Sequence, residues 1–188
     1  MVTEACNLLF ANLRRDTYDL YCEKQYSLLV HPGGILKHIT GRTRADLILV
    51  KKNDKISAPT NQNFARAVYS VIEVKRGSAQ WGGVQSDLRR LAEFKHHNQN
   101  ARAFLLLVSE GQLPETFVDD GGWSQRGKKI IKGERAHYRV RRTCKAARTF
   151  QAVDTAHYAC MIEVFANPAL KKLDKLITPP VRKARYPG

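Results

Sequence analysis

The chain has 188 residues, a length that fits one domain with a sizeable core, and 43% of them are hydrophobic. No apolar run approaches the ~20 residues of a membrane-spanning helix, which argues against an integral membrane protein. Lys and Arg number 32 against 17 Asp and Glu, a formal net charge of +15. Such an excess attracts polyanions, so nucleic acid is the expected partner and a membrane is not.

The N-terminus and the cysteines bear on location. The opening residues MVTEACNLLF lack the basic segment and the small-residue cleavage site of a secretory signal, so we expect a cytoplasmic protein. The four cysteines are scattered and form no CxxC pair, which favours free thiols in a reducing compartment. They are Cys6, Cys22, Cys144 and Cys160.

Apolar periodicity divides the first half of the chain into helices and strands. A stripe at helical spacing predicts the first helix, and short runs such as RADLILV and VYSVIEVK are typical of buried strands. In chain order, the expected elements are a helix over 3–14, an extended segment over 19–30, strands over 44–50 and 68–75, a helix over 80–97 and a strand over 102–108. Two buried strands separated by a helix indicate a βαβ unit in an α/β fold.

The second half of the chain is richer in loops and in positive charge. We expect strands over 136–143 and 157–165, then a terminal helix capped by Asn167 with Pro168 at its first position. No linker or repeat is visible. The chain is therefore interpreted as one domain over 1–188, with a core of about 1–108 and a basic C-terminal extension of about 112–188.

Three charged residues within apolar strands carry the chemical prediction. Glu73 and Lys75 lie two residues apart on one strand and therefore share a face, and Asp46 lies in the preceding apolar strand. Burying such charges is costly unless they pair or bind a metal. If the strands pair, Asp46 and Glu73 converge and can hold Mg²⁺ or Mn²⁺, cations that prefer oxygen ligands. Lys75 would then orient the attacking water or stabilise developing charge.

The order of elements and the residues Asp46, Glu73 and Lys75 resemble the PD-(D/E)XK nuclease superfamily, which includes restriction endonucleases and Holliday-junction resolvases. Ala45 replaces the Pro of the motif. The resemblance covers about residues 1–108. It implies a restriction-endonuclease-like core with a central mixed sheet flanked by helices, and it adds the Val74 backbone carbonyl as a metal ligand. It further implies a metal-dependent phosphodiesterase that works as a monomer or as a homodimer.

Three more residues are candidates for the same site. Some members of the superfamily add an acid from the first helix, where Glu4 is the candidate and Glu23 the competitor. RecB-like members carry a Gln in the helix after the motif. Gln85 fits that place, although Arg89 stands where an aromatic residue is expected. All three have a plain alternative as surface residues.

A basic stretch completes the prediction. Its side chains suit contact with backbone phosphates, with a solvated charged face as the alternative. The predicted contacts are Arg126, Lys128, Lys129, Lys132, Arg139, Arg141 and Arg142. The favoured function is a DNA endonuclease. An RNA nuclease of the same fold and a non-catalytic nucleic-acid-binding module remain as alternatives, because no sequence feature reports on recognition of the 2′-hydroxyl.

Overall fold

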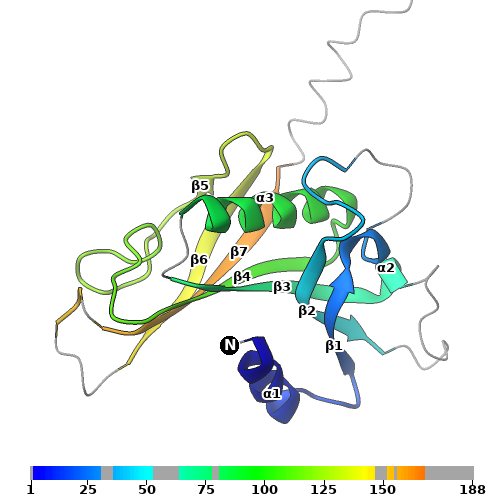
Figure 1. Cartoon of the computed structure of the whole chain (residues 1–188), viewed down its shortest axis with the longest axis horizontal. Helices are drawn as coiled ribbons and strands as arrows, with labels where there is room; N and C mark the ends of the chain where they lie inside the picture. Colours follow the sequence, from blue (N-terminus) through cyan, green and yellow to red (C-terminus); the bar gives the residue numbers. More distant parts are fainter. Residues whose placement is uncertain are drawn as a thin grey trace, which may run out of the picture.

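A computed structural model describes residues 2–30, 36–52, 64–77, 81–146, 152–154 and 156–167. The strands form one mixed seven-stranded sheet in the order β1-β2-β3-β4-β7-β6-β5 (Figure 1). β3 and β4 run parallel, and the other neighbours are antiparallel. The α/β class and the mixed sheet agree with the prediction. The proposed terminal helix beyond Asn167 and the polar loop over 53–63 lie outside the described residues.

The element bounds follow the sequence pattern closely. They are α1 (Val2–Asn12), β1 (Tyr18–Gln25), a 3₁₀ turn (Tyr26–Leu28), β2 (Arg44–Lys51), α2 (Phe64–Ala67), β3 (Val68–Arg76), α3 (Trp81–His97), β4 (Arg102–Ser109), β5 (Lys129–Ile130), β6 (Ala136–Lys145) and β7 (Tyr158–Ala166). The extended segment expected over 19–30 is wrong at its end, where the chain turns at Tyr26. The short elements α2 and β5 were not predicted, because two to four residues carry no periodic signal.

The larger hydrophobic core lies between the sheet and α3. The helix buries Val84, Leu88 and Leu91, which recur at helical spacing. The sheet contributes inward residues such as Leu105 and Ile162, both fully buried. Each large aliphatic side chain buried here contributes roughly 1.5–3 kcal/mol. This packing fixes α3 across the strands that carry the predicted site.

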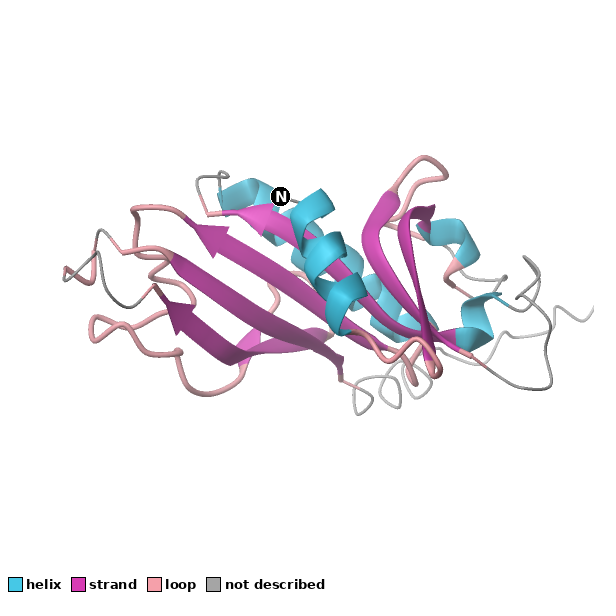
Figure 2. Ribbon diagram, turned by 90° about the horizontal axis from the view of Figure 1, so that it is seen from below, coloured by secondary structure: helices cyan, strands magenta, loops and turns pink. Residues whose placement is uncertain are grey.

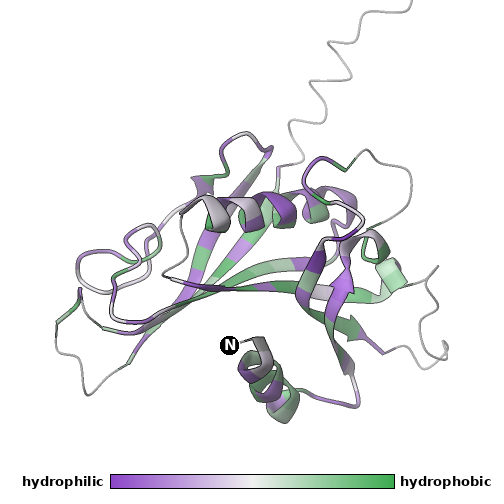
Figure 3. Cartoon of the chain, in the orientation of Figure 1, coloured by the Kyte–Doolittle hydropathy of each residue, from purple (hydrophilic) through white to green (hydrophobic). Residues whose placement is uncertain are grey.

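The opposite face of the sheet is only partly covered. A smaller cluster of Leu47, Ile72 and Val74 packs against Ala5 and Leu9 of α1. In Figure 1, α1 lies on one side of the sheet and α3 on the other. Seen from the α1 side in Figure 2, β6 and β7 have no described helix over this face. In Figure 3, β6 is mainly polar and β7 is mainly apolar.

Strand β7 joins the two predicted regions of the chain into one sheet. It pairs with β4 of the expected core region on one side and with β6 of the basic extension on the other. Residues from both regions, Leu105 and Ile162 among them, belong to the same hydrophobic core. None of the helices in the described part of the chain combines the length and apolarity needed to cross a bilayer.

Candidate active site

Asp46 and Glu73 face each other across the β2–β3 pair. Leu47 pairs with Ile72 in the antiparallel register, and one step further along places Asp46 opposite Glu73. The backbone N–H of Val74 donates a 2.7 Å hydrogen bond to Oδ2 of Asp46. This bond holds the Asp46 carboxylate against β3, next to Glu73. The convergence of two acids expected from the sequence is therefore present.

Burial and neighbouring groups set the electrostatics of Glu73, whose side chain is 4% exposed. Its Oε1 accepts a 2.6 Å hydrogen bond from the hydroxyl of Tyr26 and lies 3.8 Å from Nε of Arg90. Burial raises the pKa of Glu73 to about 7, and the adjacent Asp46 carboxylate acts in the same direction. Tyr26 and Arg90 oppose this rise in the pKa. Glu73 is thus a buried acid that titrates near neutral pH.

Lys75 points to the same side of the sheet as Glu73 and reaches α3. Its Nζ lies 2.8 Å from Oδ2 of Asp87, whose side chain is 2% exposed. Arg90 forms a second ion pair with Asp87, one helical turn away. The side chain of Lys75 is 30% exposed. Its ammonium group is therefore held by a buried carboxylate yet keeps a path to solvent.

Tyr26, Asp87 and Arg90 belong to this site and were not predicted. For Asp87 a signal existed: it lies three residues after Val84 and four before Leu91, inside the apolar stripe of α3. A charged residue at such a position is buried and needs a partner. Tyr26 carried no comparable signal, because only the turn after β1 brings it beneath Glu73.

The donor set fits a hard divalent cation. The negative charges of Asp46 and Glu73 repel each other, which contributes to the raised pKa of Glu73. A cation bound between the two carboxylates would offset that repulsion. The hydrogen bonds from Val74 and Tyr26 each use one carboxylate oxygen, and each carboxylate has a second. The N–H and C=O of one strand residue point to the same side, so the Val74 carbonyl faces β2, as does the Val74 N–H that donates to Asp46. Within the described residues no group of three or more Asp, Glu, His or Cys side chains could share an ion.

The structure does not bring Glu4 or Gln85 to this pair. Glu4 lines a groove under α1, on the face of the sheet opposite to Glu73. Gln85 lines a small crevice between α3 and the β5–β6 edge, together with Trp81 and Lys132. The predicted helices exist, but α1 carries Glu4 on the other face of the sheet, and Gln85 of α3 lies toward the β5–β6 edge.

Glu23 lies closer to the site but points elsewhere. The β1–β2 register places it opposite Asp46, between the pairs made by Cys22 and Lys24. Its φ of 52° is in the left-handed region, and regular pairing is interrupted there. The exposed carboxylate lies 4.0 Å from Arg44. Glu23 therefore borders the site without contacting Glu73.

The basic residues predicted to contact nucleic acid divide between the two faces of the sheet. Arg139 and Arg142 project on the α1 face, because they pair with Glu163 and Met161 of β7. Lys132 contributes to the crevice on the α3 side. Arg126 and Lys128 are exposed before β5. Two more are engaged within the protein: Lys129 donates to the carbonyl of Thr116, and Arg141 donates to Glu163.

Comparisons with protein-family models, with curated proteins and with solved structures give no significant match. The geometry around Asp46 and Glu73 is therefore the ground for any functional inference. That geometry unites a buried acid, Glu73, with the half-buried Asp46 and with a lysine on the strand face of Glu73, all from residues on β2 and β3.

Proposed function

We propose that this chain is a metal-dependent endonuclease of the PD-(D/E)XK type, which hydrolyses phosphodiester bonds in DNA with Asp46, Glu73 and Lys75. The observation that carries the proposal is the position of Asp46 opposite Glu73, fixed by the Val74 hydrogen bond. The element order α1, β1, β2, β3, α3 and β4 supports a restriction-endonuclease-like core. The net charge of +15 suits a polyanionic substrate.

Asp46, Glu73 and the Val74 carbonyl would hold Mg²⁺ or Mn²⁺. When bound, such a cation polarises the phosphoryl oxygen and acidifies a water molecule. Asp46 is oriented for this role by Val74, and Glu73 by Tyr26. Neither carboxylate needs to move far, because a hydrogen bond holds Asp46 at 2.7 Å and another holds Glu73 at 2.6 Å. Preorganisation of this kind is what a site that stabilises developing charge requires.

Lys75 would supply positive charge at the scissile phosphate. Its ammonium group has a 2.8 Å contact with Asp87 and partial access to solvent. Asp87 itself is held by Arg90. Asp87 is thus a positioning residue that sets the direction of the Lys75 side chain, while Lys75 donates to a phosphate oxygen or to the attacking water.

A cleavage assay tests the proposal. Plasmid, linear, branched and single-stranded DNA, together with tRNA, are incubated with the protein in Mg²⁺, in Mn²⁺ and in EDTA. We expect metal-dependent cleavage of DNA, reduced on the order of 100-fold or more in Asp46→Asn, Glu73→Gln and Lys75→Ala. The exposed residues Asp120, Glu115 and Lys51 offer matched controls with the same substitutions. Cleavage that survives all three site variants would contradict the assignment, and degradation of tRNA alone would move the substrate to RNA.

A non-catalytic binding module is the competing function, and one observation favours it. Glu73 already has Tyr26 and Arg90 as neighbours, and Lys75 already has Asp87, as in a structural ion-pair network. Such a module binds nucleic acid equally well with and without metal and shows no turnover on any substrate. A binding isotherm in EDTA, set beside the cleavage assay, separates the two functions.

A further inference from the structure

Aromatic and arginine side chains gather on the face of the sheet that carries α1, away from the proposed active site. They come from the adjacent strands β4, β7 and β6. The register places Phe104 and Arg139 on either side of Glu163, and His137 beside Phe165. We name this surface the aromatic–arginine face. Its residues are Arg102 and Phe104 of β4, Glu163 and Phe165 of β7, and His137, Arg139, Arg141 and Arg142 of β6.

The rings on this face are organised by contacts between neighbouring strands. His137 stacks on Phe165 with ring centroids 5.2 Å apart and an angle of 13° between the planes. The guanidinium of Arg141 lies 5.3 Å from the centre of the Phe165 ring, and that of Arg102 lies 4.7 Å from the centre of the Phe104 ring. Phe104 and Phe165 both remain partly exposed. Partly exposed rings held in place by neighbours are a ready platform for stacking.

One buried acid orients two of the arginines. Glu163 is 5% exposed, and it accepts hydrogen bonds from Arg102 at 3.0 Å and from Arg141. Burial would raise the pKa of Glu163, but the two arginines outweigh it and hold the pKa below its usual value. Glu163 cancels one of the four arginine charges on the face. Arg139 and Arg142, which are exposed, add positive charge that no acid on the face offsets.

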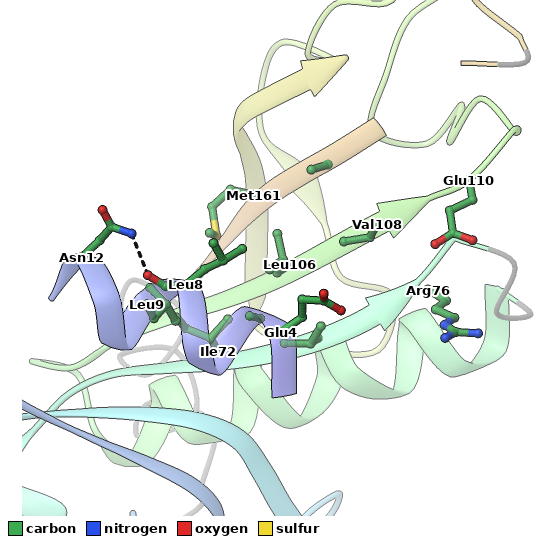
Figure 4. Close-up of a pocket in the computed structure, with 13 residues that line it drawn as sticks. Glu4, Leu8, Leu9, Asn12, Ile72, Arg76, Leu106, Val108, Glu110 and Met161 are labelled. Carbon is green, nitrogen blue, oxygen red and sulfur yellow. Dashed lines mark hydrogen bonds between the residues drawn. The ribbon is translucent and has the colours of Figure 1, made fainter. Parts of the chain in front are cut away.

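The face continues into an apolar groove of about 610 Å³ under α1. Figure 4 shows Leu8 and Leu9 of α1 on one side of this groove, with Leu106 and Met161 of the sheet on the other side. Glu4, Arg76 and Glu110 lie at its edge. Positive charge on this side of the sheet therefore lies mainly on β6, while the region under α1 is mainly apolar.

We propose that the aromatic–arginine face binds a single strand of nucleic acid, with bases stacked on Phe104, Phe165 and His137 and phosphates held by Arg139 and Arg142. A single strand exposes both base faces and phosphates, and proteins bind it by combining aromatic platforms with basic side chains. A duplex hides its base faces and would leave the rings unused. Since the face is opposite to Asp46 and Glu73, it is a second surface, separate from the proposed active site.

Binding of fluorescein-labelled oligo(dT), measured by anisotropy in EDTA, tests this surface without requiring catalysis. Arg139→Ala/Arg142→Ala should weaken binding about tenfold and lower the salt slope by about 1.4, or about 0.7 for each lost phosphate contact. Phe165→Leu should weaken binding about fivefold or more with an unchanged salt slope, because it removes stacking and no charge. The matched control Lys51→Ala/Arg66→Ala removes two exposed charges on β2 and α2, outside this face, and should bind as the wild type does.

Three outcomes would overturn the proposal. The first is an equal loss of affinity in Lys51→Ala/Arg66→Ala and in Arg139→Ala/Arg142→Ala, which indicates general attraction of a basic protein to a polyanion. The second is undiminished binding in Phe165→Leu and Phe104→Leu, once circular dichroism shows that both are folded. The third is binding of heparin or of duplex DNA with the same affinity and the same sensitivity to Phe165→Leu. Because EDTA prevents metal-dependent cleavage, failure here leaves the nuclease proposal standing, and the reverse also holds.

Discussion

The hydroxyl of Tyr26 donates a 2.6 Å hydrogen bond to Oε1 of Glu73, joining residues 47 positions apart in the chain. It is the contact through which the turn after β1 supports an acid on β3. Burial and Asp46 favour the protonated form of Glu73, and Tyr26 favours the charged form. The balance between them makes the site sensitive to pH near neutrality.

Stability of the metal-free protein should fall as the pH rises from about 4.5 to about 7. Between these values, folded Glu73 keeps a proton that the unfolded chain has lost, because the folded pKa is raised from 4.5 to about 7. The full effect on the free energy of unfolding is about 3 kcal/mol, reached above pH 7. Urea unfolding in EDTA across this range measures it. Glu73→Gln should remove the effect and exceed the wild type in stability at high pH, whereas the exposed control Glu115→Gln should keep it.

Magnesium should stabilise the wild type more at about pH 8 than at about pH 5. Deprotonated Glu73 is the form that binds a cation, and a ligand at ten times its Kd adds about 1.4 kcal/mol to the free energy of unfolding. Thermal unfolding with and without Mg²⁺ provides the measurement. Asp46→Asn and Glu73→Gln should lose the stabilisation while Asp120→Asn keeps it. An equal shift in all four proteins would place the ion elsewhere.

Replacing Tyr26 by Phe should destabilise the protein more at about pH 8 than at about pH 5. The variant leaves a buried carboxylate without its donor, a loss of about 1.5–3 kcal/mol when Glu73 is charged and about 1 kcal/mol when it is neutral. Tyr158→Phe is the matched control, because that hydroxyl donates to the Val153 carbonyl, which does not titrate. The loss in the free energy of unfolding caused by Tyr158→Phe should be the same at both pH values. Equal pH dependence of the two variants would show that Tyr26 does not act on Glu73.

Glu23→Gly should increase stability by about 1 kcal/mol. Glu23 has a φ of 52°, a conformation that costs a residue with a Cβ about 1–2 kcal/mol and glycine almost nothing. The exposed pair with Arg44 at 4.0 Å is too long and too solvated to offset this. Chemical denaturation measures the gain. Glu23→Ala separates the backbone effect from loss of the carboxylate, since it keeps the strain and should show no increase.

Gly77→Ala should destabilise the end of β3 by about 1–3 kcal/mol through overpacking. A Cβ at Gly77 would lie 2.5 Å from Cβ and 2.7 Å from Cα of Ser109. Gly41→Ala has open space around its Cβ and should change the free energy of unfolding by less than about 0.5 kcal/mol. Adding Ser109→Gly to the Gly77→Ala variant should recover part of the loss. If it recovers none, the side chain of Ser109 is not the cause, and the 2.7 Å approach to the Cα of that residue is.

The strands and the acid pair were predictable because their signals are local. RADLILV and VYSVIEVK are apolar runs of strand length, and alternation alone puts Glu73 and Lys75 on one face. The expectation that Asp46 meets Glu73 needed only that these two strands pair. The stripe of α3 was equally clear, and its bounds were expected within a residue or so. The position of β7 between β4 and β6 had no such local signal, because pairing of strands far apart in the chain depends on the whole sheet.

The sequence by itself therefore determined the secondary structure around the site and the chemical types that meet there. Only the tertiary structure decided which side of the sheet each remaining residue occupies. It placed Glu4 and Arg139 on the face opposite to Glu73, and it brought Tyr26 to Glu73 and Asp87 to Lys75. The physical reason is that a periodic pattern in the sequence shows only which residues share one face of a helix or strand. Packing and strand register decide whether that face meets the core, the site or the solvent.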